Sequence, residues 1–263
     1  MSNASVSVII PCYRSRASIT RAIESVYNQT MRPTEVILVD DCSPDDTLDK
    51  LYEEQKKYPS SWVKVIALSQ NVGPGNARNA GWEQAVGRYV AFLDSDDCWH
   101  PRKVELQYQW LEGNPDVSLL GQCFGAGLRD EPQVDSVLFT EVGERQLLFS
   151  NRFTTSSVML RRDIESRFKH GKRFCEDYHL WSDILFSGGR CFNMDFPLVR
   201  TFKPVYGDSG LSGQLWSMEK GELGVHVALL RAGRIGVLPF CSAVTWSLLK
   251  FIRRIINSSL RRN

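Results

Sequence analysis

No two of the seven cysteines stand in a CxxC pair, and their number is odd. Small disulfide-stabilised domains and structural zinc sites depend on paired or closely spaced cysteines, so the sequence argues against both classes. A reducing cytoplasm is the expected compartment. With 263 residues, 43% of them hydrophobic, the chain is long enough for one α/β domain to bury a full core without such cross-links.

A long apolar run is also missing. The chain reaches a strand-like segment by Val6 with neither a basic region nor an extended apolar stretch before it, so we expect no secretory signal. Residues 235–249 are nearly all apolar or small, but about 15 residues that include Pro239 are too few to cross a bilayer. The sequence therefore predicts no transmembrane helix.

Acidic residues are absent after Glu222, whereas seven lysines and arginines follow it. The formal net charge of +2 thus combines +7 in this tail with −5 in residues 1–222. Between Trp246 and Ile256, aromatic and aliphatic residues are interleaved with Lys250, Arg253 and Arg254. This pattern is typical of a helix lying in the membrane interface with its cations facing anionic headgroups.

We therefore expect peripheral attachment of the tail to an anionic membrane surface, at the inner face of the cell membrane. The alternative that the sequence leaves open is a C-terminal helix packed on its own domain or on the partner in a homodimer. No nucleic-acid partner is expected, because the chain has no recognised binding module and its acidic remainder would oppose a duplex.

Short apolar segments alternate with helical patterns along the first part of the chain. The segments that read as strands are Val6–Ile10, Glu35–Val39, Trp62–Leu68 and Tyr89–Leu93. Helical spacing connects them over 19–27, after Ser43, and within 73–87, with Ser43 predicted as an N-cap and Pro44 as the first helical residue. Such an alternation indicates βαβ units and a parallel sheet.

Polar residues follow three of these strands directly. The segments are Pro11-Cys12-Tyr13, Asp40-Asp41 and Asp94-Ser95-Asp96-Asp97. Parallel sheets bind ligands beyond the carboxyl ends of their strands, so the three segments are expected to meet there. A bare acidic loop is usually a solvated turn, but carboxylates crowded at this edge repel one another unless a cation compensates. Hard oxygen ligands suit Mg²⁺ or Mn²⁺ shared with substrate phosphates.

Several motifs in a fixed order give the chain a recognisable pattern. They are Ser7-Val8-Ile9-Ile10-Pro11-Cys12-Tyr13, Ile37-Leu38-Val39-Asp40-Asp41-Cys42-Ser43, residues 73–79, Phe92-Leu93-Asp94-Ser95-Asp96-Asp97 and Glu176-Asp177. Over roughly residues 5–185 the sequence resembles the family-two glycosyltransferases of the GT-A fold, of the bacterial polysaccharide and lipopolysaccharide type.

That resemblance implies an α/β fold with a Rossmann-like, mixed, mostly parallel sheet flanked by helices and followed by a C-terminal helical tail. The implied division is a transferase domain over 1–220 and a basic amphipathic tail over 221–263. Within the domain, 1–115 would bind the nucleotide-sugar and 116–220 the acceptor.

The resemblance also implies roles for individual residues. Pro11, Tyr13, Asp41 and Arg78 would line the nucleotide pocket, with Asp41 and Arg78 near the base, and Asp96 near the ribose. Asp97, with Asp96 and Asp94, would hold the metal, although Asp94 can instead orient the loop. Asp177, beside Glu176, would be the catalytic base, since neighbouring carboxylates raise each other's pKa.

The implied function is a metal-dependent inverting transfer of one sugar. By the resemblance, the donor would be a nucleotide-diphosphate sugar, with UDP as the expected nucleotide, and the acceptor a hydroxyl of a lipid-linked or cell-surface glycan. Two alternatives stay open. One is a sugar-nucleotide-forming nucleotidyltransferase, although Pro11-Cys12-Tyr13-Arg14 replaces its Gly-rich basic loop. The other is an inactive binding module, because Tyr206-Gly207-Asp208-Ser209 lacks a histidine that many relatives carry.

Overall fold

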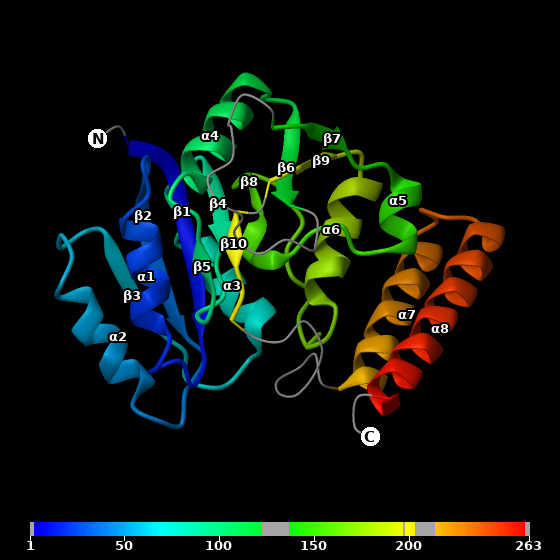
Figure 1. Ribbon diagram of the computed structural model, residues 1–263, viewed down its shortest axis with the longest axis horizontal. Coiled ribbons are helices and arrows are strands. Elements are labelled where there is room, and N and C mark those ends of the chain that lie inside the picture. The colour runs from blue at the N-terminus through cyan, green and yellow to red at the C-terminus, as the bar shows by residue number, and fades with distance from the viewer. Residues whose placement is uncertain (1–2, 123–136, 197, 203–213, 261–263) are drawn as a thin grey trace.

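The computed structural model describes residues 3–122, 137–196, 198–202 and 214–260 (Figure 1). The strands are β1 (Asn3–Cys12), β2 (Arg32–Asp40), β3 (Val63–Ala67), β4 (Tyr89–Phe92), β5 (Cys98–Trp99), β6 (Val117–Gln122), β7 (Phe139–Glu141), β8 (Met159–Arg161), β9 (Arg190–Met194) and β10 (Val199–Arg200). The helices are α1 (Ile19–Tyr27), α2 (Thr47–Gln55), α3 (Pro74–Glu83), α4 (Lys103–Gly113), α5 (Glu144–Phe149), the 3₁₀ turn η2 (Thr155–Ser157), α6 (Glu176–Phe186), α7 (Leu215–Arg231) and α8 (Val237–Leu260). Cys123 and the predicted acceptor segment at 206–209 lie outside the described residues.

The main sheet has the strand order β3-β2-β1-β4-β8-β6-β9-β7. The first four strands are parallel, as are β6 and β9. By contrast, β8 runs antiparallel to both β4 and β6, and β7 runs antiparallel to β9. The predicted mixed, mostly parallel sheet flanked by helices is confirmed. The parallel half, formed by the βαβ units, is joined to the second half through the reversed strand β8.

The central strand β1 is buried on both sides. Its residues Val8 and Ile10 belong to one hydrophobic cluster, together with residues of α1 and α4. Ile9 belongs to the other cluster, which includes residues of α3 and α6. Successive side chains of a strand point to opposite faces of the sheet, so an unbroken apolar run contributes side chains to the hydrophobic clusters on both faces.

The predicted start of the second helix is wrong. The helix α2 begins at Thr47, with Asp46 rather than Ser43 at its N-cap and Pro44 ahead of the helix. Ser43 has other partners, because its Oγ accepts a hydrogen bond from the Arg14 N–H at 3.2 Å and its own N–H donates to Asp40 Oδ2. The turn thus ties the ends of β1 and β2 together instead of starting a helix.

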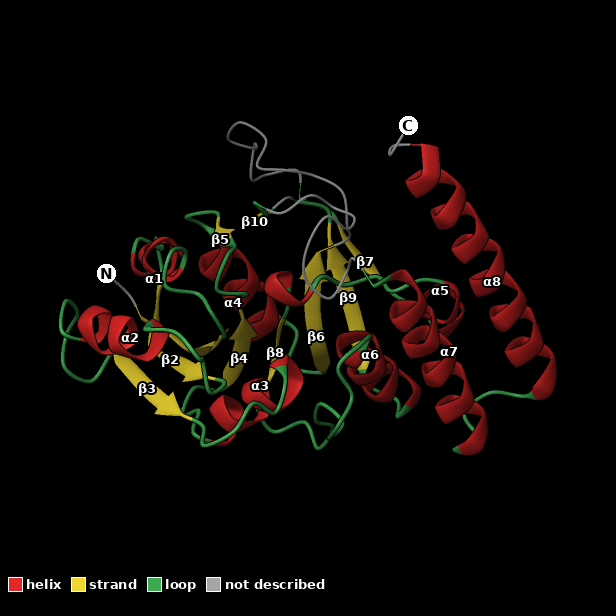
Figure 2. Ribbon diagram, turned by 90° about the horizontal axis from the view of Figure 1, so that it is seen from below, coloured by secondary structure: helices red, strands yellow, loops and turns green. Residues whose placement is uncertain are grey.

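The C-terminal helices form successive layers beyond the sheet. Figure 2 shows α6, α7 and α8 side by side and progressively farther from the strands, and α7 contacts both neighbours. No helix of the described ranges is long and apolar enough to cross a bilayer. The predicted boundary between residues 220 and 221 falls inside α7.

The contact between α7 and α8 includes several polar pairs beside the aromatic pair of Trp216 and Phe251. Glu222 of α7 accepts hydrogen bonds from Lys250 Nζ at 2.5 Å and from Arg254 Nη2 at 3.2 Å. Nearby, Ser247 Oγ donates to Glu219 Oε1 at 2.8 Å. The expectation that Lys250 and Arg254 face lipid headgroups is therefore wrong, because an ionised glutamate within the protein offers both cations a closer partner. This face of α8 instead packs on the rest of the chain, as the alternative prediction of a C-terminal helix packed on its own domain had it.

We expect Glu222→Ala to lower the free energy of unfolding by about 1–3 kcal/mol, because two partly buried cations would lose their shared partner. Burial would raise the pKa of Glu222, but Lys250 and Arg254 outweigh it and the pKa lies below the ordinary 4.5. This stabilisation is present above pH 4.5 and is lost as the pH falls through the pKa of the folded state. Urea unfolding at pH 7 and pH 4 measures it.

The matched control is Glu24→Ala, an exposed glutamate of α1. It should change stability by less than about 0.5 kcal/mol. Equal stabilities of Glu222→Ala and the wild type at pH 7 would contradict the assigned role of Glu222.

Candidate active site

The acidic segment after β4 forms a tight turn that Ser156 of η2 holds at both ends. The Asp97 N–H donates to the Asp94 carbonyl at 3.0 Å. Ser156 Oγ donates to Asp97 Oδ2 at 2.6 Å and accepts from the Asp94 N–H at 3.1 Å. Asp97 is buried, and the Asp96 carbonyl accepts from Arg21 Nη2. The turn is therefore fixed before any ligand binds.

A buried guanidinium connects this turn to the second half of the domain. Arg78, on α3, is only 4% exposed. Its Nη2 lies 2.6 Å from Asp94 Oδ1 and its Nη1 lies 3.3 Å from Glu176 Oε1. The sequence placed Arg78 beside Asp41 near a nucleotide base, whereas its hydrogen bonds in the structure go to Asp94 and Glu176.

Glu176 and Asp177 form the first turn of α6, where the helix dipole favours negative charge. Close packing sets their position. A Cβ on Gly75 of α3 would lie 3.0 Å from Glu176 Cγ, and a Cβ on Gly221 of α7 would lie 3.1 Å from Cys175 Sγ. Two helices therefore approach the acidic pair closely because they carry glycine at the contact.

Asp177 is held by residues of the segment 151–155, for which the sequence predicts no functional role. Its Oδ2 accepts from Asn151 Nδ2 at 3.1 Å and from Thr155 Oγ1 at 3.4 Å. Thr155 stands next to Ser156, which holds Asp97, so the contacts form a closed ring from the turn after β4 to α6 and back through Arg78. A run of hydroxyl residues at 154–157 was the only signal in the sequence, and such a run also occurs in ordinary loops.

The paired carboxyls are poised to hold a proton near neutral pH. Burial is the main cause that raises the pKa of Glu176 to about 7, Asp177 raises it further, and Arg78 opposes the rise. Burial also raises the pKa of Asp177, against the Tyr178 N–H and Arg78. A base is most effective when its pKa lies near the working pH, so this pair suits proton abstraction.

The residues expected around the nucleotide lie at the carboxyl ends of β1 and β2. Asp41 is buried, and its carboxylate accepts the N–H groups of Val72 and Gly73 at 2.7 and 2.9 Å. It thereby fixes the loop that leads into α3. Pro11 pairs with the second strand within β1, and Tyr13, just beyond, is 46% exposed. The predicted contacts of Pro11, Tyr13 and Asp41 with a nucleotide stay predictions.

The described ranges contain no group of three Asp, Glu, His or Cys side chains arranged to hold a metal ion. Asp94, Asp96 and Asp97 therefore do not form a three-ligand cage by themselves. This arrangement still fits Mg²⁺ or Mn²⁺, since Mg²⁺ is usually held by one or two carboxylates and completes its shell with water and substrate phosphates.

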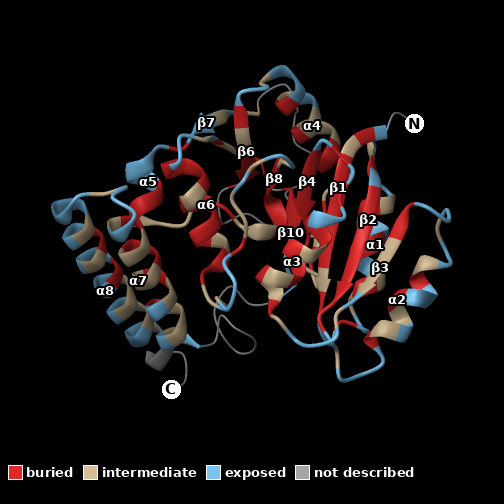
Figure 3. Cartoon of the chain, turned by 180° about the vertical axis from the view of Figure 1, so that it is seen from behind, coloured by how far each residue is buried: buried red, intermediate tan, exposed pale blue. Residues whose placement is uncertain are grey.

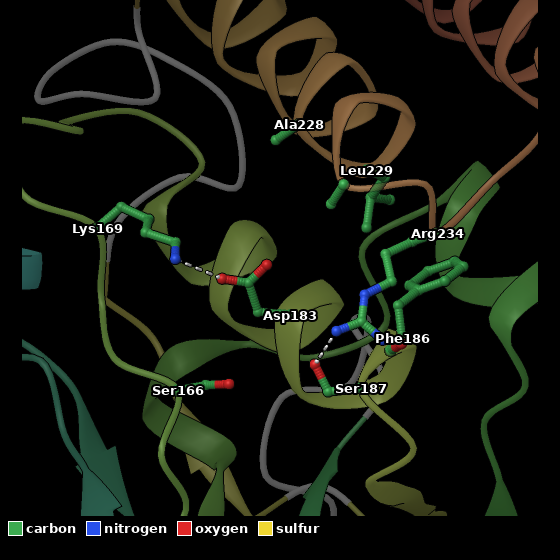
Figure 4. Close-up of a pocket in the computed structure, with 9 residues that line it drawn as sticks. Ser166, Lys169, Asp183, Phe186, Ser187, Ala228, Leu229 and Arg234 are labelled. Atoms are coloured by element: carbon green, nitrogen blue, oxygen red, sulfur yellow. Dashed lines mark hydrogen bonds and ion pairs between the residues drawn. The ribbon is translucent and has the colours of Figure 1, made fainter.

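A hollow of about 230 Å³ lies elsewhere, between the end of α6 and α7 (Figure 4). Lys169 Nζ lies 3.1 Å from Asp183 Oδ2 there, and Arg234 donates to Ser187 Oγ. None of the predicted site residues lines this hollow. The hollow is therefore separate from the candidate site around Arg78.

The fold and this carboxylate-rich edge define the chain as a GT-A glycosyltransferase. Residues 7–171 match the profile of Glycosyl transferase family 2, and the chain belongs to that family. The structure is similar to that of the mannosyltransferase PcManGT from Pyrobaculum calidifontis (TM-score 0.70, 19% identity, 99% of this chain and 76% of that one). It is also similar to TarS of S. aureus (TM-score 0.67, 22% identity, 94% and 71%).

Curated relatives carry glycan-biosynthesis names. The succinoglycan biosynthesis protein ExoO of Rhizobium meliloti is 35% identical over 209 residues, which cover 71% of this chain and 57% of ExoO. The putative teichuronic acid biosynthesis glycosyltransferase TuaG of Bacillus subtilis is 44% identical over 106 residues, 40% of this chain and 41% of TuaG. WfaP of Escherichia coli is 30% identical over 206 residues, 78% of each chain. The match thus spans about half the length of the first two relatives.

We expect Arg78→Gln to raise the pKa of Glu176 above its value of about 7, because the variant removes the cation that opposes protonation. Carboxyl ¹³C NMR of the glutamates would measure this pKa, with Glu176→Gln giving the assignment. The control is Arg88→Gln, an arginine whose side chain is 54% exposed and pairs with Glu112. An unchanged or lower pKa of Glu176 in Arg78→Gln would contradict this account.

Proposed function

We propose that the chain transfers one sugar from a UDP-linked donor to a hydroxyl of a lipid-linked glycan, with inversion at the anomeric carbon and with help from a divalent metal. The observation that carries the proposal is the ring around Arg78, which joins the acidic turn after β4 to the Glu176–Asp177 pair. The ring would thereby bring the proposed diphosphate-binding turn and the proposed proton acceptor into one site.

The names of similar proteins support the donor and the acceptor. Structures of TarS from S. aureus contain UDP-GlcNAc and UDP. WfaP and WfgD of Escherichia coli are named UDP-Glc:alpha-D-GlcNAc-diphosphoundecaprenol beta-1,3-glucosyltransferases. WfgD is 31% identical to this chain over 180 residues, 69% of its own length. By analogy, the acceptor is a glycan on a lipid diphosphate.

The charges support a metal. Asp94 and Glu176 pair with Arg78, Asp177 follows Glu176, and Asp96 and Asp97 belong to the same turn as Asp94, so carboxylates outnumber the arginine that pairs with them. We assign Asp97 and Asp96 to the ion and Asp94 to the pairing with Arg78. When bound, the ion would neutralise the departing diphosphate as a Lewis acid. PcManGT was solved with GDP-Man and Mn²⁺, in agreement with this chemistry.

Asp177 is the proposed base. Its carboxylate takes the proton of the acceptor hydroxyl as that oxygen attacks the anomeric carbon, and attack opposite the diphosphate inverts the configuration. Asn151 and Thr155 orient the carboxylate. Glu176 and Arg78 set the charge around it, and Arg78 stabilises the ionised form.

The donor and the metal are tested together. Across a panel of sugar nucleotides, we expect release of nucleoside diphosphate from one UDP-sugar with Mn²⁺ or Mg²⁺ and none with EDTA. Asp97→Asn should lower this release at least about 100-fold, because Lewis-acid stabilisation is worth several kcal/mol. Asp49→Asn, which changes an exposed aspartate of α2, is the matched control.

Two outcomes would refute the metal assignment: full activity in EDTA, or full turnover by Asp97→Asn. Donor binding in a thermal-shift assay without turnover on any acceptor would favour the inactive binding module. Formation of a sugar nucleotide from a sugar phosphate would favour the nucleotidyltransferase.

Asp177→Asn should reduce kcat about 10²–10⁴-fold while the donor KM changes less than about twofold, because a base acts on the acceptor in the transition state. In the wild type, kcat/KM should rise with pH through an acid limb near the pKa of the pair, as the base loses its proton. The matched control is Asp183→Asn on the same helix, whose carboxylate pairs with Lys169. Half or more of the wild-type kcat in Asp177→Asn would rule out the base assignment.

A further inference from the structure

The last helix, α8, has its polar and apolar faces reversed relative to a normal surface helix. Ala243, Ser247, Lys250 and Arg254 face α7. The opposite side exposes large apolar side chains, which we call the outer face of α8; they are Leu238, Leu248, Leu249, Ile252, Ile255 and Ile256. A surface helix normally turns its apolar side inward, so we expect the outer face of α8 to contact another molecule or a membrane.

The outer face is an apolar stripe over the C-terminal part of α8. Its members recur at intervals of three or four residues along the C-terminal half of the helix, and they follow Leu238 in register. At 1.5 Å per residue the stripe from Leu248 to Ile256 is about 12 Å long, and the exposed Ser242 and Thr245 separate it from Leu238. Leu238 is 82% exposed, and Leu249, Ile252 and Ile256 are each more than half exposed. Figure 3 shows α8 at the end of the molecule opposite β3.

The charges beside the stripe indicate which kind of surface the outer face contacts. Trp246, 49% exposed, and Arg253, also exposed, flank the outer face on one side. No acidic residue follows Glu222, whose charge is already matched by Lys250 and Arg254. Two copies meeting through this face would bring arginines against arginines, whereas an anionic lipid surface offers opposite charge and an apolar layer.

We propose that the outer face of α8 docks the protein on an anionic lipid surface, with the helix parallel to that surface. The aliphatic stripe enters the acyl boundary, and Trp246 and Arg253 lie at headgroup level. Lys250 and Arg254 do not bind lipid. They clamp α8 on Glu222, so the helix is presented in a fixed orientation before contact with the membrane.

Co-sedimentation with vesicles tests the proposal. The full chain should bind vesicles that contain phosphatidylglycerol and should bind pure phosphatidylcholine vesicles at least about tenfold more weakly. The triple variant Leu249→Ser, Ile252→Ser, Ile256→Ser should lose at least about tenfold in apparent affinity for the anionic vesicles. Arg253→Glu should weaken anionic binding while leaving the weak binding to neutral vesicles unchanged.

A matched triple variant changes exposed apolar residues of the other surfaces, Tyr52→Ser, Val86→Ser and Leu138→Ser, which are 42%, 58% and 66% exposed. Its vesicle binding should stay within about twofold of the wild type. Release of nucleoside diphosphate from a water-soluble donor should be the same in both triple variants and the wild type. A failure of docking can thus be told apart from a failure of the proposed reaction.

Three results would overturn the proposal: no binding of the wild type to anionic vesicles, equal binding to neutral and anionic vesicles, or unchanged binding of the α8 triple variant. Light scattering adds a fourth. If the wild type is a dimer and the α8 triple variant a monomer, the outer face belongs to a second copy of the chain rather than to lipid.

Discussion

The candidate active site depends on one buried cation, Arg78, that pairs with two carboxylates. The Arg78 guanidinium has its two ends on Asp94 and Glu176, which come from different halves of the domain. An arginine that is 4% exposed is stable only when its charge is matched nearby, so the acidic turn and the start of α6 are drawn toward the same point. The same pairing keeps a cluster of acidic side chains together before substrate arrives.

The contacts of Arg78 also affect the pKa of the paired carboxyls. Arg78 lowers the pKa of Glu176, while burial and the neighbouring Asp177 raise it, and the balance lies near neutral pH. On the other side of the site, Ser156 fixes Asp97 while the adjacent Thr155 contacts Asp177. Because adjacent residues of η2 contact both groups, a shift of this turn would disturb Asp97 and the proposed base Asp177 together.

The C-terminal helices contain a similar arrangement of charges, but with negative and positive groups exchanged. There one carboxylate, Glu222, lies between two cations, Lys250 and Arg254. Because Lys250 and Arg254 pair with Glu222, they point toward α7 rather than toward solvent, and the polar side of α8 lies toward the protein. The aliphatic side is thereby left outward, which converts an ordinary helix-packing contact into a surface suited to lipid.

Local periodicity in the amino-acid sequence was enough to predict the βαβ order, the strands of the parallel half and the acidic segments that follow them. The rule that the ends of parallel strands gather at one edge of the sheet then predicted that these segments lie together. It also contained the motifs that revealed the family. The folded structure was needed to show the partners of Arg78, the contacts of Asn151, Thr155 and Ser156, and the direction in which Lys250 and Arg254 point. These contacts join residues far apart in the chain, such as Arg78 and Glu176, and no local pattern in a single sequence encodes which distant carboxylate a buried cation will meet.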